Sequence, residues 1–194
     1  MAGLREVKKQ RTRDSIQREA LRLIARQGYH GTTCEQIAAA AEVSPATLYR
    51  YFPSKEDIIL WDVFDPLIAE AVRIRPIRES ALSAVRHGLA AALGDVAPGE
   101  LEAVRKRAAL VLSVPALRAR SWEQLESLQA NLTAALAERA ARRGERRDAE
   151  VAAAVCASVV GLAVRRWVAQ GGNLARFVDE ALEAIPGLVG GSGR

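Results

Sequence analysis

Apolar residues recur at helical spacing along nearly the whole chain, and no stretch alternates apolar and polar residues as a strand does. The first clear case is an i, i+4, i+7, i+8 pattern at Ile16, Ala20, Leu23 and Ile24, which Gly28 ends. With 49% hydrophobic residues the chain can form a buried core, which excludes a disordered protein. These observations predict an all-α fold of about nine helices.

Capping residues mark where the next helices begin. Thr33 with Gln36 forms a capping box for a second helix, and Ser44 followed by Pro45 begins a third. Ser54 begins a fourth helix that runs toward Arg75 and that Pro66 should bend or break. Prolines and glycines delimit five more helices, at about 77–93, 100–114, 116–143, 146–170 and 173–185.

The composition changes near residue 53, from short helices with polar, basic outer faces to long helices rich in Ala, Leu and Val. We therefore expect a small N-terminal domain at residues 1–53, a larger helical domain at 54–186 and a loose tail at 187–194. Residues 1–27 contain eight basic and three acidic residues, so this segment alone matches the net charge of +5 of the whole chain. Such a basic arm permits a nucleic-acid partner.

The third helix can hold only about two turns, which is too short to be stable in water by itself. If Leu48 points inward, Ser44, Tyr51 and Phe52 lie within about 60° of the core direction. Ala46 and Arg50 then point away from the core. A short capped helix that docks on a second helix through a turn at residues 40–43 is a helix-turn-helix.

The outer face of this helix offers groups that suit DNA. Hydroxyls fit phosphate oxygens, a guanidinium fits guanine, and small Ala and Thr side chains fit thymine methyl groups. The alternative is an ordinary helical pair with a solvated face, but the basic arm and this combination of residues favour DNA binding.

The string GYHGTTCEQIAAAAEVSPATLYRYFPSKEDII, residues 28–59, resembles the DNA-binding domain of the TetR family of transcription regulators. The resemblance runs from about Thr12 to Ile59, and the remainder is similar only in length and helical character. It implies a homodimer that binds a palindromic operator on double-stranded DNA and is released when a small-molecule effector enters the C-terminal domain.

The resemblance also implies roles for single residues. Thr33 would cap the second helix and contact a phosphate, and Lys55 would contact another phosphate. Tyr49 and Tyr51 would contact phosphates or sugars. The positions that read bases or grip the adjacent backbone would be Ser44, Pro45, Ala46, Thr47 and Arg50. For Glu35 we expect an interaction with the N-terminal dipole of the second helix.

The C-terminal half has no nucleotide-binding or catalytic motif, and His30 and His87 are the only histidines. We therefore expect neither an enzyme nor a bound cofactor or metal. A pocket for a small apolar or amphipathic ligand is expected between the helices, and the alternative for each candidate lining residue is plain core. The candidates are Trp61, Phe64, Leu67, Ile68, Leu110, Trp122 and Leu125. Residues 107–126 are faintly similar to the subgroup that responds to acyl-CoA-type ligands. Arg118 and Arg120 would then meet an anionic head group, and the alternative is that both are simply solvated.

The last two long helices have a broad face of small residues, which permits close helix packing in a buried core. The resemblance instead implies an intermolecular four-helix bundle. The expected interface residues are Ala154, Val155, Ser158, Val159, Leu162 and Trp167. A dimeric regulator without any small-molecule ligand is the alternative function, and a contiguous cavity in the larger domain would favour the ligand-responsive one.

Cys34 and Cys156 have neither disulfide nor metal spacing. We expect Cys156 to be inert and Cys34 to be a passive small residue, with a redox switch at Cys34 as the alternative. No signal peptide is evident, and the apolar run Val151–Val164 is too short to span a bilayer. These features predict a cytoplasmic protein without a membrane partner.

Overall fold

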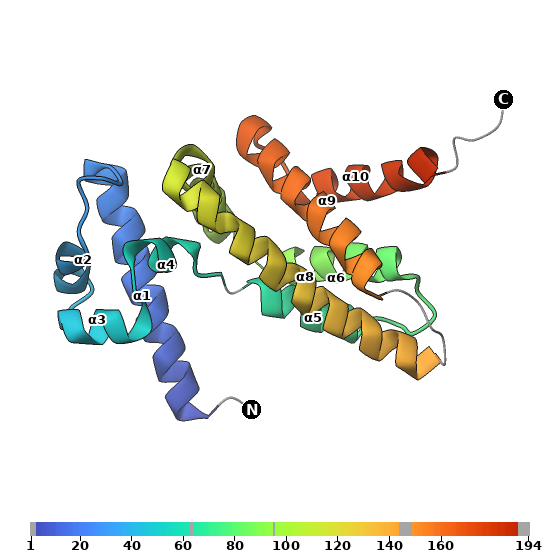
Figure 1. The fold of residues 1–194 in the computed structure, drawn as a ribbon, viewed down its shortest axis with the longest axis horizontal. Coiled ribbons are helices and arrows are strands. Elements are labelled where there is room, and N and C mark those ends of the chain that lie inside the picture. Colours follow the sequence, from blue (N-terminus) through green and yellow to red (C-terminus); the bar gives the residue numbers. More distant parts are fainter. Residues whose placement is uncertain (1–2, 63, 95, 144–148, 190–194) are drawn as a thin grey trace. The chain divides into compact units, whose positions relative to one another are not determined.

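The computed structural model describes residues 3–62, 64–94, 96–143 and 149–189. Within these ranges the chain is all-α, as predicted, with ten helices and no strand (Figure 1). The helices are α1 (Leu4–Gln27), α2 (Cys34–Ala40), α3 (Pro45–Tyr51), α4 (Lys55–Leu60), α5 (Phe64–Arg73), α6 (Ala81–Gly94), α7 (Pro98–Ser113), α8 (Pro115–Arg143), α9 (Ala149–Gln170) and α10 (Leu174–Val189). Helix α10 includes the first three residues of the predicted loose tail, and the end of that tail lies outside the described residues.

The helices form two compact units. The N-terminal unit contains Met1–Trp61 and Leu110–Arg120, and the C-terminal unit contains Asp62–Ala109 and Ser121–Arg194. The N-terminal unit is therefore larger than the predicted domain 1–53, because it includes α4 and the corner where α7 meets α8. Leu117 at this corner is fully buried with Ile24 and Ile59.

The predicted fourth helix is divided into α4 and α5, and the division precedes Pro66 instead of falling at it. A proline ring clashes with the carbonyl four residues earlier, but it is tolerated in the first helical turn, where its missing N–H needs no partner. Because Pro66 lies in the first turn of α5, the interruption falls before Phe64. This division raises the number of helices from nine to ten.

The C-terminal unit has its own core, to which α5, α6, α8, α9 and α10 contribute. Gly88 allows α6 to approach α5 closely, because a Cβ atom there would lie 2.8 Å from the Val72 side chain and 2.9 Å from its backbone nitrogen. Helix α9 is long and apolar enough to cross a membrane, judged by length and composition alone. One side of it, with Ala153, Cys156 and Ala163 fully buried, packs within this core.

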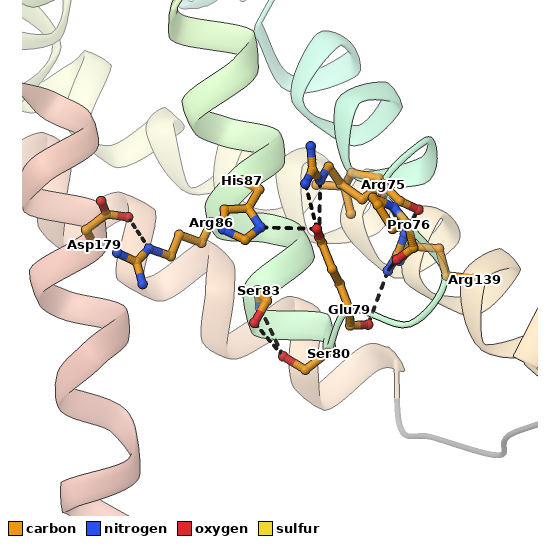
Figure 2. Close-up of polar contacts among 10 residues, drawn as sticks. Arg75, Pro76, Glu79, Ser80, Ser83, Arg86, His87, Arg139 and Asp179 are labelled. Carbon is orange, nitrogen blue, oxygen red and sulfur yellow. Dashed lines mark hydrogen bonds and ion pairs between the residues drawn. The ribbon is translucent and has the colours of Figure 1, made fainter.

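Arg139 of α8 is 4% exposed and fixes the loop between α5 and α6 (Figure 2). Its guanidinium donates to the carbonyl oxygens of Val72 (3.3 Å), Arg75, Pro76 (3.0 Å) and Glu79 (3.3 Å). The last carbonyls of a helix have no partner within that helix, so Arg139 acts as a cap for the end of α5.

Glu79, in the same loop, lies between the side chains of Arg75 and of His87 from α6 (Figure 2). Its carboxylate accepts hydrogen bonds from the Arg75 guanidinium and lies 3.3 Å from His87 Nδ1. The hydrogen bonds from Arg75 are the main reason why the pKa of Glu79 falls to about 2. Glu79 therefore remains ionised at neutral pH and holds the loop against α6.

We predict that Arg139→Met lowers the free energy of unfolding by about 2–4 kcal/mol, because buried carbonyls lose their donors. The matched control is Arg142→Met in the same helix, where the exposed side chain donates to the carbonyls of Arg73 and Glu138. Urea unfolding at fixed protein concentration measures both, and the control should lose less than about 1 kcal/mol. Equal losses would contradict the capping role of Arg139.

Candidate nucleic-acid interface

Both halves of the predicted capping box are present at the start of α2. The Gln36 backbone N–H donates to Thr33 Oγ1 (3.3 Å), and the Thr33 N–H donates to Gln36 Oε1 (3.0 Å). Thr33 itself is exposed beside this cap. The cap fixes the direction in which α2 leaves the preceding turn.

The turn between α2 and α3 contains a stop signal that sequence reasoning missed. Glu42 has a φ of 55°, its N–H donates to Ala39 O (3.2 Å), and the Val43 N–H donates to Ala38 O (3.0 Å). These two bonds form a Schellman motif, in which the left-handed residue is usually glycine. A glutamate at this position gives no such signal in the sequence. The motif ends α2 and redirects the chain into α3.

Helix α3 begins at the predicted N-cap. Ser44 is exposed, and its Oγ accepts the Thr47 N–H (3.1 Å), while Pro45 occupies the first helical position. Leu48 is fully buried and Phe52 is 3% exposed. They pack in a cluster with residues of α1, α2 and α4: Ile16, Ala20, Ile37, Ala38 and Ile58. Caps and packing together therefore hold a helix that is too short to be stable alone.

The opposite side of α3 faces solvent and has the residues that suit DNA. Pro45, Ala46, Tyr49 and Arg50 are exposed, and Thr47 and Tyr51 are half-buried. The Arg50 guanidinium lies 5.6 Å from the centre of the Tyr51 ring, and that of Arg13 from α1 lies 5.8 Å from it. Two guanidinium groups thus flank one aromatic ring at the end of α3, which gives a positive, hydrogen-bonding edge.

Glu35 and Cys34 occupy the first turn of α2. The pKa of Glu35 is lowered, chiefly because its own backbone N–H at the helix start donates to the carboxylate, and the Tyr49 hydroxyl also donates to it (3.3 Å). This agrees with the expected interaction with the helix N-terminus. Burial raises the pKa of the Cys34 thiol, which leaves little reactive thiolate and favours a passive residue. Cys156 is fully buried, and burial raises its pKa to about 11.

Lys55 is largely engaged inside the N-terminal unit. Its Nζ donates to the carbonyl oxygens of Tyr29 (2.6 Å) and Thr32 (2.7 Å) and lies 4.1 Å from the centre of the Tyr29 ring. Lys55 therefore holds the turn between α1 and α2. An ammonium group has three N–H donors, so one remains for the phosphate contact, which stays a prediction.

Arg120 has a structural role that the sequence did not reveal. It donates to Ser54 Oγ (3.1 Å) and to Asp57 Oδ1 (2.6 Å) at the start of α4. Burial alone would raise the pKa of Asp57, but hydrogen bonds from Ser54 and Arg120 outweigh that effect and lower it. Arg120 is thus neither simply solvated nor free for a ligand head group. Arg120 and Asp57 are 63 residues apart in the sequence, so local patterns cannot reveal that they are paired.

The predicted ligand-lining residues are divided between the two units. Trp61 packs edge-on against Phe52, with ring centres 5.9 Å apart, and Leu110 contributes to the packing around Ile24. Phe64, Ile68 and Leu125 belong to the core of the C-terminal unit. Leu67 is 54% exposed and Trp122 is 65% exposed.

A cavity of about 560 Å³ lies in the C-terminal unit among α6, α7, α9 and α10, and none of these seven residues lines it. Its lining includes Leu93, Leu101, Arg105, Trp167 and Ala175. Glu102, which also lines it, receives two hydrogen bonds from Arg105 (2.8 and 2.9 Å). In the described part of the chain, no group of three or more His, Cys, Asp and Glu residues could hold a metal ion.

The residues predicted at a dimer interface separate into three sets by exposure. Val155 and Leu162 are 37% and 36% exposed, Ser158 is exposed, and Val151 extends this line of α9 at 57% exposure. Ala154 and Val159 are half-buried. Trp167 is 4% exposed, and its Nε1 donates to Gly172 O (3.0 Å), so it belongs to the core of its own unit and not to the exposed line.

Comparisons with known proteins agree with this arrangement. Residues 16–60 match the family model "Bacterial regulatory proteins, tetR family", and residues 79–188 match "MftR C-terminal domain". The HTH-type transcriptional regulator TcmR of Streptomyces glaucescens is 40% identical over 144 residues, which cover 71% of this chain and 64% of TcmR. The chain thus spans slightly less than two thirds of that relative.

For two further proteins, the alignment with this chain covers more of the relative's length. The nucleoid occlusion factor SlmA of Enterobacter sp. strain 638 is 30% identical over 150 residues, 75% of each chain. The crystal structure of Thermus thermophilus FadR, described as a TetR-family repressor in complex with lauroyl-CoA, aligns with a TM-score of 0.59 at 26% identity. That alignment covers 94% of this chain and 96% of FadR. The chain therefore belongs to the TetR family, and α1 to α4 contain that family's helix-turn-helix domain.

Proposed function

We propose that the chain is a repressor that binds a palindromic operator as a homodimer and leaves it when a small amphipathic effector binds the C-terminal unit. The observation that carries this proposal is α3, whose inner face is fixed by Leu48 and Phe52 while its outer face remains open to solvent. A helix held in this way can enter the major groove without first having to fold. A cytoplasmic location follows from the DNA partner.

The outer face of α3 favours a mixed mode of reading. Arg50 is the exposed residue of α3 that can donate two parallel hydrogen bonds to a guanine edge. Pro45 and Ala46 have no side-chain donor, so they would read thymine methyl groups and groove shape. Thr33, Ser44, Thr47, Tyr49 and Tyr51 offer hydroxyls for the backbone around this point.

For Arg50→Ala we predict a loss of about 1–3 kcal/mol per protomer in binding to a duplex that the protein selects from random-sequence DNA, and little change on scrambled DNA. Arg18→Ala, on the far side of α1, removes the same charge and should have little effect on the preference. Fluorescence anisotropy with both duplexes measures the difference. If Arg50→Ala weakens selected and scrambled DNA alike, Arg50 grips phosphate and does not read a base.

The cavity in the C-terminal unit supports a ligand-responsive regulator. Its size is within the range of small-molecule sites, and it combines apolar walls with the Glu102–Arg105 ion pair. An apolar body with one anionic or polar group would fit such a lining. FadR, whose structure is a complex with lauroyl-CoA, is a precedent for an amphipathic ligand in this family.

We expect amphipathic ligands, with lauroyl-CoA as the first probe, to release the wild-type protein from its selected duplex. Ala175→Trp, which places an indole ring in the cavity and leaves less room for a ligand, should retain DNA binding and lose the release. The control is Ala91→Trp, an exposed position on α6 outside the cavity, which should respond as the wild type does. If no member of an amphipathic panel releases the DNA, the dimeric regulator without a ligand is favoured.

A dimer through α9 would cover the exposed line of Val151, Val155, Ser158 and Leu162. These residues follow one another at intervals of three or four along one side of the helix, which suits packing against a second copy. The half-buried Ala154 and Val159 flank the line and would allow close approach. Exposed apolar surface of this kind favours association.

The double variant Val155→Glu/Leu162→Glu should give monomers on a sizing column, because charges would be buried at the interface. Both side chains are exposed, so the fold of the unit should persist. Leu67→Glu/Ile74→Glu is the matched control, since these residues are 54% and 72% exposed on α5 and just after it. Dimers that persist unchanged in the first variant would place the interface elsewhere.

A further inference from the structure

Helix α1 begins well before the part of the chain that matches the helix-turn-helix family model. It starts at Leu4, whereas the family model begins at residue 16, so about three helical turns precede the domain. This extension is mostly exposed, with Leu4 at 90% and Val7 at 40%. Residues 4–13 contain five basic residues and one acidic residue, which gives a net charge of +4. Packing within the protein therefore does not account for the basic residues of this extension, because little of it is buried.

Three of the five basic residues of the extension share one side of the helix, and Lys8 and Arg11 lie outside it. At 100° per residue, Arg5, Lys9 and Arg13 fall within the same arc of about 100° as the core residues Ile16, Ala20 and Ile24. The side of α1 that faces the helix-turn-helix core thus changes from apolar to basic where that core ends. We call Arg5, Lys9 and Arg13 the basic stripe.

The basic stripe is continuous with the outer face of α3. Arg13 lies over the Tyr51 ring, and Arg50 of α3 flanks the same ring. Figure 1 shows α1 continuing past α3 toward the N-terminus. Lys9 is one turn beyond Arg13, and Arg5 is one turn beyond Lys9. The stripe therefore extends the positive edge of the DNA-reading surface outward.

The charges of the stripe remain available to a polyanion. Lys9 pairs with Glu6 (2.8 Å), and the hydrogen bond from Lys9 lowers the pKa of Glu6, but both side chains are more than half exposed. Such surface pairs contribute little and are easily exchanged. Arg5 and Arg13 are separated by roughly 12 Å along the helix axis. This length corresponds to about three to four phosphates of one DNA strand, whose axial rise is about 3.4 Å each.

We propose that the basic stripe lies along the DNA phosphate backbone beside the base pairs that α3 reads, so that α1 widens the protein's footprint without adding base specificity. This proposal rests on the proposed function, because it uses the same DNA. Charge complementarity and continuity with Arg50 and Tyr51 identify duplex DNA as the occupant. The stripe supplies salt-dependent affinity by displacing counterions from these flanking phosphates.

The test is a double variant, Arg5→Gln/Lys9→Gln, which leaves Arg13 and its contact with Tyr51 in place. Glutamine retains helix propensity, so α1 should persist, and circular dichroism checks its helix content. The matched control is Arg18→Gln/Arg22→Gln, which removes the same charge from the far side of the same helix. Binding is measured by anisotropy at several salt concentrations on two duplexes. One is the selected duplex with several extra base pairs on each side, and the other is trimmed to the base pairs that α3 covers.

On the flanked duplex, the stripe variant should reduce the slope of log K against log salt by about two units per bound protomer, or about four for the dimer, since each phosphate contact contributes about 0.9. On the trimmed duplex it should match the wild type, and the control should change neither slope by more than a fraction of a unit. An unchanged slope in the stripe variant, or equal changes in both variants, would overturn the proposal. A wild type that prefers no duplex over scrambled DNA would instead overturn the proposed function.

Discussion

The burial of Leu48 is the contact on which the DNA-reading surface depends. Leu48 is fully buried and packs with Ile16 of α1, Ile37 of α2 and Ile58 of α4, so one side chain joins α3 to three other helices. Because α3 has only seven residues, it has no independent stability. Its outer face has a defined direction only because its inner face is anchored. The hydrogen bonds at Ser44, at Glu42 and at Lys55 then fix both ends of the motif.

Features that depend on neighbouring residues could be predicted from the sequence. The caps at Thr33, Ser44 and Ser54, the inward direction of Leu48 and the all-α fold all follow from local pattern, and the structure confirms them. The break before Phe64 differs from the prediction by a few residues, because a proline in a sequence can mark either a bend or the first turn of a new helix, and Pro66 is in a first turn.

Features that depend on distant partners could not be predicted. Nothing near Arg120 indicates that it binds Asp57, and nothing near Arg139 indicates that it caps α5. Basic side chains are frequent in this chain, so a sequence cannot tell a buried donor from a solvated one. The same limit applies to α9, where spacing puts Leu162 and Trp167 about 140° apart around the helix but does not tell which of these two apolar sides faces inward. Gly88 is a further example, since its role depends on Val72, a distant residue that leaves no room for a side chain at position 88.

The central claim is that α3 is already formed and anchored before it meets DNA. Amide hydrogen exchange of Thr47 and Leu48 in the DNA-free, full-length protein tests it most directly, because these N–H groups donate to Ser44. The account predicts that both amides are protected to a degree comparable with the buried part of α1 around Ala20. Exchange as fast as in an unfolded chain would contradict it, and would mean that α3 folds only on the DNA.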